Sequence, residues 1–102
     1  MPNWLDLLAE CHSFQWDDGN AAKNWASHAV SQAEAEQAFF NRPLRIAPDA
    51  AHSIRERRFA ALGKTDQARL LTIVFTIREQ KVRVISARAM SRRERGLYEH
   101  EA

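Results

Sequence analysis

Leu70-Leu71-Thr72-Ile73-Val74-Phe75-Thr76-Ile77 is the most continuously apolar stretch of the chain, and most of its residues are β-branched, aromatic or leucine. Such residues favour strands, and a strand that is covered on both faces is expected to be apolar along its whole length. Residues 70–77 are therefore expected to form a central strand. Residues 57–63 and 82–88 flank it, have strand composition too, and are joined to it by short polar segments, which predicts an antiparallel meander.

Helices are expected before and after this meander in the chain. Turn and N-cap residues precede a helix over about residues 18–28. Ser31 and Glu34 have the spacing of a capping box, in which each residue satisfies a free backbone N–H, and they open a second helix that reaches Phe39 or Phe40.

The same capping pattern returns after the last strand. Ser91 and Glu94 open a short C-terminal helix that carries several arginines. Two further short strands are expected, at residues 14–16 and 44–46, from their alternation of large apolar and polar residues.

The fold class predicted from these elements is α+β. Two N-terminal helices pack on a three- to four-stranded antiparallel sheet, and a short C-terminal helix closes it. A chain of 102 residues fits one compact domain. We expect residues 1–13 to be an N-terminal extension and residues 14–102 to be the domain.

Composition excludes several classes of protein. No apolar run is long enough to cross a membrane, and the first ten residues do not resemble a secretion signal, so the expected location is the cytoplasm. The single cysteine, Cys11, cannot form an internal disulfide, and the four histidines are not spaced like a zinc site. No metal and no cofactor are expected.

Charge is distributed unevenly along the chain. Residues 1–40 contain one lysine and six acidic residues, while residues 41–102 contain fourteen basic and seven acidic residues, so the two parts carry about −5 and +7. Most of the basic residues are arginine, which binds phosphate and carboxylate groups through two parallel hydrogen bonds. The second part therefore suits a polyanion or an acidic partner, or is a solvated basic surface.

Several short motifs follow one another in a characteristic order over about residues 14–98. They are Phe14-x-Trp16-Asp17, Asn24, His28, Val30, Glu56-x-Arg58-Phe59, Leu62-Gly63, Leu70-Leu71, Arg83-Val84-Ile85-Ser86-Ala87-Arg88, Arg92-Arg93-Glu94 and Tyr98. This order and spacing resembles the BrnT toxin family.

The resemblance implies a metal-independent ribonuclease of RelE-like architecture. It also implies a BrnA-like ribbon-helix-helix antitoxin that neutralises the toxin in a hetero-oligomer and alone provides contact with operator DNA. The chain departs from the family pattern at Asn20, Ser27 and Ala29, where the family usually has lysine, lysine and glycine. Lys23 supplies one positive charge near these positions.

Metal-free RNA cleavage needs a base for the 2′-hydroxyl, an acid for the leaving 5′-oxygen and positive charge on the phosphate. Arg58 and Arg88 lie in the best-matched strand motifs, and we expect both to clamp one phosphate. Glu56 is a candidate base because residues i and i+2 of a strand share a face. His28 is a candidate for proton transfer, because an imidazole can both accept and donate a proton. The alternatives are salt bridges between these arginines and Glu56 or Glu94, and a helix-capping role for His28.

A second set of residues is expected to hold the RNA. It consists of Lys23, Arg83, Arg92, Arg93 and Tyr98. The basic members would contact the backbone without reading the bases, and their alternative is a solvated surface. Tyr98 would stack on a base or donate a proton, and its alternative is to pack the last helix onto the domain.

The sequence thus predicts a toxin that cleaves RNA and inhibits translation. A catalytically inactive module that binds the antitoxin or nucleic acid is the competing hypothesis.

Overall fold

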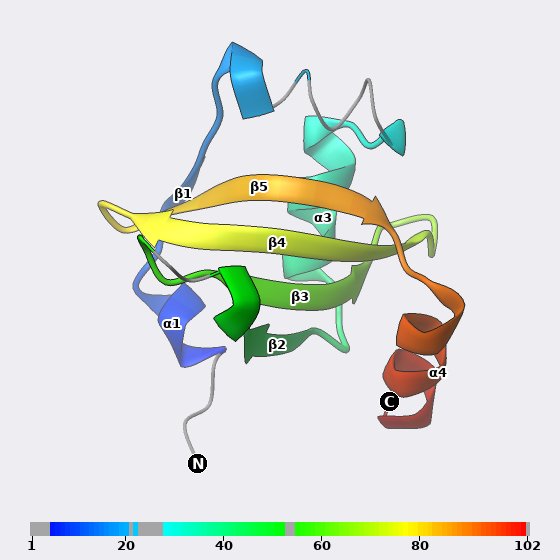
Figure 1. The fold of residues 1–102 in the computed structure, drawn as a ribbon. Coiled ribbons are helices and arrows are strands. Elements are labelled where there is room, and N and C mark those ends of the chain that lie inside the picture. The colour runs from blue at the N-terminus through cyan, green and yellow to red at the C-terminus, as the bar shows by residue number, and fades with distance from the viewer. Residues whose placement is uncertain (1–4, 21, 23–27, 53–54, 102) are drawn as a thin grey trace.

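The fold is built on a five-stranded sheet in the order β1-β5-β4-β3-β2 (Figure 1). The computed structural model describes residues 5–20, 22, 28–52 and 55–101. The strands are β1 (Ser13–Gln15), β2 (Arg45–Pro48), β3 (Phe59–Lys64), β4 (Leu70–Arg78) and β5 (Lys81–Ala89). β3, β4 and β5 form the antiparallel meander that the sequence predicted, and β4 lies in the centre.

The predicted sheet was wrong in strand number and direction. The sheet has five strands rather than three or four, and it is mixed because β1 pairs with β5 in parallel, from Ser13 opposite Lys81. A short strand separated from its partner by most of the chain can run in either direction, and nothing in three residues fixes which. β2, predicted at residues 44–46, pairs antiparallel with β3, and its Pro48 is tolerated because β2 is an edge strand.

The start of β3 also differs from the prediction. The strand was expected from residue 57 but begins at Phe59. The backbone carbonyl of Arg57 instead accepts a hydrogen bond of 2.7 Å from the Thr76 hydroxyl. The segment before β3 contains a 3-10 helix, η1 (Ala50–His52).

One face of the sheet is covered by α3 (Gln32–Phe40), which lies behind the sheet in Figure 1. The predicted capping box of Ser31 and Glu34 is confirmed. Ala35, Ala38 and Phe39 of α3 are buried, and the core continues into the sheet through Leu71, Ile73, Phe75, Val82 and Val84. Burying a valine, leucine, isoleucine or phenylalanine side chain contributes about 1.5–3 kcal/mol to stability.

The N-terminal part of the chain packs on this core as well. The segment begins with α1 (Asp6–Ala9), and Leu5, Leu7 and Leu8 contact the core cluster, so the predicted extension lies against the domain from residue 5 onwards. In the predicted helix at 18–28, residues 18–20, 22 and 28 are helical, while residues 21 and 23–27 lie outside the described part. No helix in the described part of the chain is long and apolar enough to cross a membrane.

The opposite face of the sheet, called the open face below, carries Thr72, Val74 and Thr76 of β4. Across from them on β5 lie Arg88, Ser86 and Arg83. α4 (Arg92–Glu101) and η1 lie in front of this face in Figure 1 and flank it without covering its middle. Side chains alternate along a strand, so the residues between the core residues face this side. A register irregularity between Val74 and Phe75 lets Arg83 and Ser86, which are three residues apart, lie on the same face.

Candidate nucleic-acid interface

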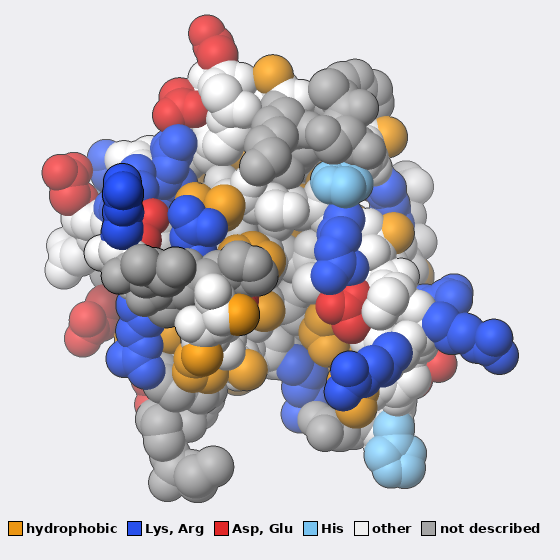
Figure 2. All heavy atoms as spheres, viewed as in Figure 1, with side chains coloured by type: hydrophobic (Ala, Val, Ile, Leu, Met, Phe, Trp, Pro, Cys, Tyr) orange, Lys and Arg blue, Asp and Glu red, His pale blue; other side chains and the backbone are white. Residues whose placement is uncertain are grey.

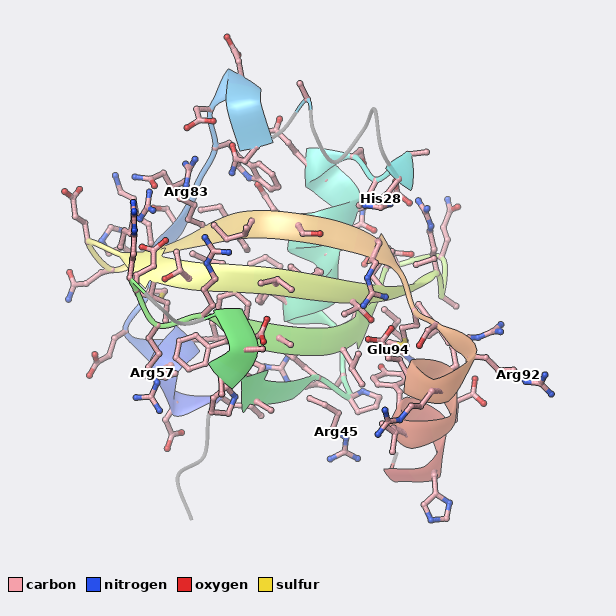
Figure 3. All side chains as sticks on the ribbon, viewed as in Figure 1. His28, Arg45, Arg57, Arg83, Arg92 and Glu94 are labelled. Carbon is pink, nitrogen blue, oxygen red and sulfur yellow. The ribbon has the colours of Figure 1, made fainter. Side chains whose placement is uncertain are left out.

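The polar side chains of the open face gather at two separate ends. The Arg83 end consists of Asp17, Glu56, Arg58, Arg78 and Arg83, and the Arg88 end consists of His28, Thr72, Arg88, Glu94 and the first residues of α4. Arg83 pairs with Thr76 and Arg88 with Thr72, so β4 separates the ends by four residues, or roughly 13 Å. Figure 3 shows Arg83 at one end and His28 and Glu94 at the other, and Figure 2 shows basic side chains on both sides of the face.

At the Arg88 end, a bidentate ion pair joins β5 to α4. Arg88 Nη1 donates to Glu94 Oε1 at 2.7 Å, and Nη2 donates to Oε2 at 3.0 Å. Thr72 Oγ1 and the backbone N–H of Ser91 also donate to Oε1, at 2.9 and 2.8 Å. These bonds, that from Arg88 above all, lower the pKa of Glu94 to about 2, so the carboxylate is ionised at neutral pH.

Local sequence explains this arrangement. Ser91 and Glu94 form the predicted capping box, since the backbone N–H of Glu94 donates to Ser91 Oγ at 3.2 Å. β5 ends only two residues before Ser91, so the first turn of α4 starts beside Arg88. The Arg88 side chain remains 40% exposed, against 23% for Glu94, so the guanidinium is accessible to a ligand.

His28 belongs to the same end of the sheet. Arg69, directly before β4, donates from Nη2 to the His28 carbonyl at 3.3 Å and from Nη1 to the Ala29 carbonyl at 2.9 Å. Nη1 also pairs with Glu34 Oε2 at 2.9 Å. Arg69 thus ties the residues around His28 to the edge where β4 begins and β5 ends, and His28 itself is exposed.

Ion pairs link the residues of the Arg83 end. Arg78 donates to both carboxylate oxygens of Glu56, at 3.0 and 2.8 Å. Arg83 Nη2 pairs with Asp17 Oδ2 at 3.0 Å. The Arg78 hydrogen bond is the main reason why the pKa of Glu56 is lowered, and the charges of Arg58 and Arg83 act in the same direction.

The predicted joint clamp of Arg58 and Arg88 is wrong as geometry. β4 lies between β3 and β5, and Arg58 precedes the end of β3 that faces Phe75, away from the Thr72–Arg88 pair. The predicted strand face shared by Glu56 and Arg58 is also wrong, because both residues precede β3. The salt-bridge alternative is confirmed for Arg88, which pairs with Glu94. Glu56 pairs with Arg78, which that alternative did not include.

The expected RNA contacts other than Arg83 fall into three groups. Arg92 and Arg93 are exposed at the start of α4, and Arg92 points away from the sheet (Figure 3). The prediction that Tyr98 stacks on a base is wrong, because the residue is only 4% exposed. Its hydroxyl donates to the Pro43 carbonyl at 2.6 Å, so Tyr98 packs α4 onto the domain, which was the alternative. Lys23 lies outside the described residues.

Sequence reasoning missed several members of these clusters. Thr72 and Arg78 join the sites through strand register, and Arg69 joins through hydrogen bonds to residues about 40 positions earlier in the chain, so no local pattern shows them. Asn20, treated as the loss of a surface charge, is 7% exposed. Its side-chain amide donates to the carbonyls of Gln15 and Val84, so position 20 ties β1 to β5. In the described residues, no three His, Cys, Asp or Glu side chains are grouped as metal ligands.

Comparisons with known proteins point to one family. A family model described as the ribonuclease toxin BrnT of type II toxin–antitoxin systems matches residues 16–94. The 1.1 Å crystal structure of the Brucella abortus ribonuclease toxin BrnT is similar, with a TM-score of 0.59 and 22% identity over 78% of this chain and 97% of that one. No curated protein gives a significant match.

Proposed function

This chain belongs to the BrnT family of ribonuclease toxins of type II toxin–antitoxin systems, and we propose that it cleaves RNA on the open face of its sheet without a metal ion. The observation that carries this proposal is the Arg88 side chain, which is 40% exposed and is held by two parallel hydrogen bonds to Glu94. Figure 3 shows His28 near the same end of the sheet.

The Arg88 end supplies the groups that the reaction needs. Arg88 binds the scissile phosphate and stabilises the charge that builds on it, which is the role of a preorganised donor in a transition state. His28 moves the proton between the 2′-hydroxyl and the leaving 5′-oxygen, because imidazole accepts and donates near neutral pH. Arg92 and Arg93 hold the RNA backbone beside them.

The Arg83 end holds the RNA rather than cutting it. A carboxylate with a lowered pKa is a weaker base, so Glu56 is unsuited to the role of base that its spacing suggested. Arg58 and Arg83 act instead as phosphate contacts. The two ends lie roughly 13 Å apart along β4. RNA that reaches both ends must therefore extend along β4 and β5.

The partner is an antitoxin, as the family implies. We propose that it is of the BrnA ribbon-helix-helix type, that an acidic part of it covers the open face, and that operator DNA is bound through it. Cytoplasmic action and RelE-like architecture belong to the same proposal. A purified stoichiometric complex should fail to cleave RNA, and cleavage at the free toxin's rate would contradict this arrangement.

Cleavage of a labelled RNA in EDTA tests the assignment of the site. Wild type, Arg88→Ala, His28→Ala and a control, Arg42→Ala, are compared after circular dichroism has shown that each is folded. Arg42 is the matched control because its guanidinium binds the Phe39 carbonyl at the end of α3, on the opposite side of the sheet. We expect the Arg88 and His28 variants to lose about 100-fold or more in rate and the control to keep it.

Two results would overturn the proposal. If the folded wild type does not cut, the competing function, a module that binds antitoxin or nucleic acid without catalysis, takes its place. If Arg88→Ala cuts as fast as Arg42→Ala, the site lies elsewhere. Expression in cells without the antitoxin separates the two functions independently. An active ribonuclease should arrest growth as wild type and lose this effect as Arg88→Ala, whereas a binding module should not arrest growth through its catalytic residues.

A further inference from the structure

Three structural elements meet at one carboxylate, that of Glu94. Oε1 accepts hydrogen bonds from Arg88 of β5, Thr72 of β4 and the backbone of Ser91 at the start of α4, while Oε2 accepts the second bond from Arg88. We propose that Glu94 is a positioning residue for RNA cleavage, which orients the Arg88 guanidinium on the open face. This inference rests on the role proposed above for Arg88.

The geometry goes beyond what a helix cap requires. A capping box needs only one carboxylate oxygen, which accepts the backbone N–H of the N-cap residue. In Glu94 that oxygen is Oε1, which binds Ser91 N. Oε2 points to Arg88 instead, at 3.0 Å. Two parallel bonds fix both the position and the plane of a guanidinium, whereas a single bond would leave it free to rotate.

The carboxylate is itself held in place. Its bonds to Thr72 and Ser91 come from elements that pack on different sides of it, and the side chain is only 23% exposed. The orientation of Arg88 therefore depends on the docking of α4, which Tyr98 fixes through its bond to the Pro43 carbonyl. A displacement of about 1 Å in a reacting group is enough to lower a rate by 100-fold.

Charge gives the proposal a distinctive signature. Glu94 partly offsets the positive charge of Arg88, so its removal makes the open face more basic. Glu94→Gln keeps the size of the side chain and removes its charge. We expect this variant to bind RNA as tightly as wild type or more tightly, and to cleave it at least tenfold more slowly. Loss of folded protein cannot produce tighter binding.

A double-mutant cycle tests the proposal in the full-length chain. Single-turnover cleavage is measured for wild type, Glu94→Gln, Arg88→Ala and the double variant, and RNA affinity is measured with an oligonucleotide that carries a 2′-methoxy group at the cleaved position. If Glu94 acts through Arg88, Glu94→Gln slows wild type at least tenfold but changes the Arg88→Ala rate less than twofold. Equal effects in both backgrounds would overturn the positioning role.

Ser91→Ala is the matched control. It removes the other half of the same capping box, the bond from Glu94 N to Ser91 Oγ, and leaves the carboxylate on Arg88. Its single-turnover rate should stay within twofold of wild type. A tenfold loss in Ser91→Ala would mean that the cap, rather than the ion pair, determines the rate, and would contradict the proposal.

A spectroscopic measurement separates this proposal from the proposed function. The ¹⁵N-edited NMR signals of the Arg88 guanidinium should show more restricted rotation in wild type than in Glu94→Gln, where the bond from Nη1 to the Ala89 carbonyl at 3.2 Å remains. Free rotation in wild type overturns the positioning role whatever the protein cleaves. Restricted rotation in a folded chain that does not cut RNA overturns the ribonuclease proposal, and the positioning role with it, while leaving the ion pair intact.

Discussion

Individual ion pairs on the open face differ in how much they contribute to the stability of the fold. Arg78 and Glu56 are 45% and 28% exposed, and pairs of this kind typically contribute less than about 1 kcal/mol because water and salt screen them. The Glu94 pair differs because Thr72 and Ser91 add hydrogen bonds to the same carboxylate. Its loss should therefore be visible in stability as well as in cleavage.

The pH dependence of stability should reveal Glu94. Folding lowers its pKa from 4.5 to about 2. The ionised carboxylate therefore stabilises the fold fully above pH 4.5, and this contribution is lost as the pH falls towards 2. We expect Glu94→Gln to lower the free energy of unfolding by about 1–2 kcal/mol at pH 7, and the difference from wild type to vanish near pH 2. A difference that does not change with pH would contradict the assignment.

Ala29 occupies a backbone conformation that favours glycine, with φ of 52°. The residue follows His28, so a family glycine at this point has a structural reason. Replacing Ala29 by Gly should raise the free energy of unfolding by about 0.5–1 kcal/mol, because relief of strain exceeds the added freedom of the unfolded chain. Ala60→Gly, in the regular strand β3, should lower it by a similar amount. Denaturant unfolding of both variants measures the contrast, and destabilisation by Ala29→Gly would be the opposite result.

At the scale of elements, the sequence predicted what local patterns encode. The capping boxes at Ser31 and Ser91 and the apolar run of β4 each depend on neighbouring residues, and all three were confirmed. The parallel pairing of β1 depends on contacts with β5 far along the chain, and no local signal carries it.

The same distinction explains the candidate site. His28, Arg88 and the basic start of α4 were proposed from motifs, and the structure places them at one end of the sheet. Arg58 was grouped with Arg88 because the sequence predicted a meander of three strands but not their register. With Leu62 opposite Thr72, and Thr72 opposite Arg88, the segment before Phe59 must lie at the other end.

Close contact between α3 and β3 depends on Gly63. A Cβ at this position would lie 2.8 Å from the Ala38 carbonyl oxygen and 3.3 Å from both Ala38 Cβ and Leu44 Cδ1. Gly63→Ala should push α3 from the sheet and lower the free energy of unfolding by about 1–3 kcal/mol. Gly96→Ala is the control, because a Cβ there meets nothing within 4 Å and alanine favours the helix, so this variant should gain up to about 1 kcal/mol. Equal unfolding midpoints for the two variants would show that this packing does not matter.

At the scale of the whole molecule, charge and fold divide in the same way. The acidic first part of the chain supplies α1, β1 and α3, which build the core face and one edge, while the basic second part supplies the strands and helix around the open face. A polyanion is therefore directed to one side of the molecule, where the residues proposed for cleavage lie.

Salt dependence of RNA binding should report this division. We expect Arg83→Ala to weaken binding of a single-stranded RNA similarly for all sequences and to reduce the slope of log affinity against log salt by about 0.7, the value for one phosphate contact. Arg42→Ala, on the opposite side of the sheet, should leave the slope unchanged. An unchanged slope in Arg83→Ala would remove the Arg83 end from the RNA path.

The most direct test of the account is the reaction itself, measured in EDTA on one RNA and on the same RNA with a single 2′-deoxy nucleotide at the cleaved position. We predict that the purified, folded toxin cuts the first to leave a 2′,3′-cyclic phosphate and a 5′-hydroxyl, and leaves the second intact, because the 2′-hydroxyl is the nucleophile. Cleavage of both at the same rate, or of neither, would contradict a metal-free ribonuclease on the open face.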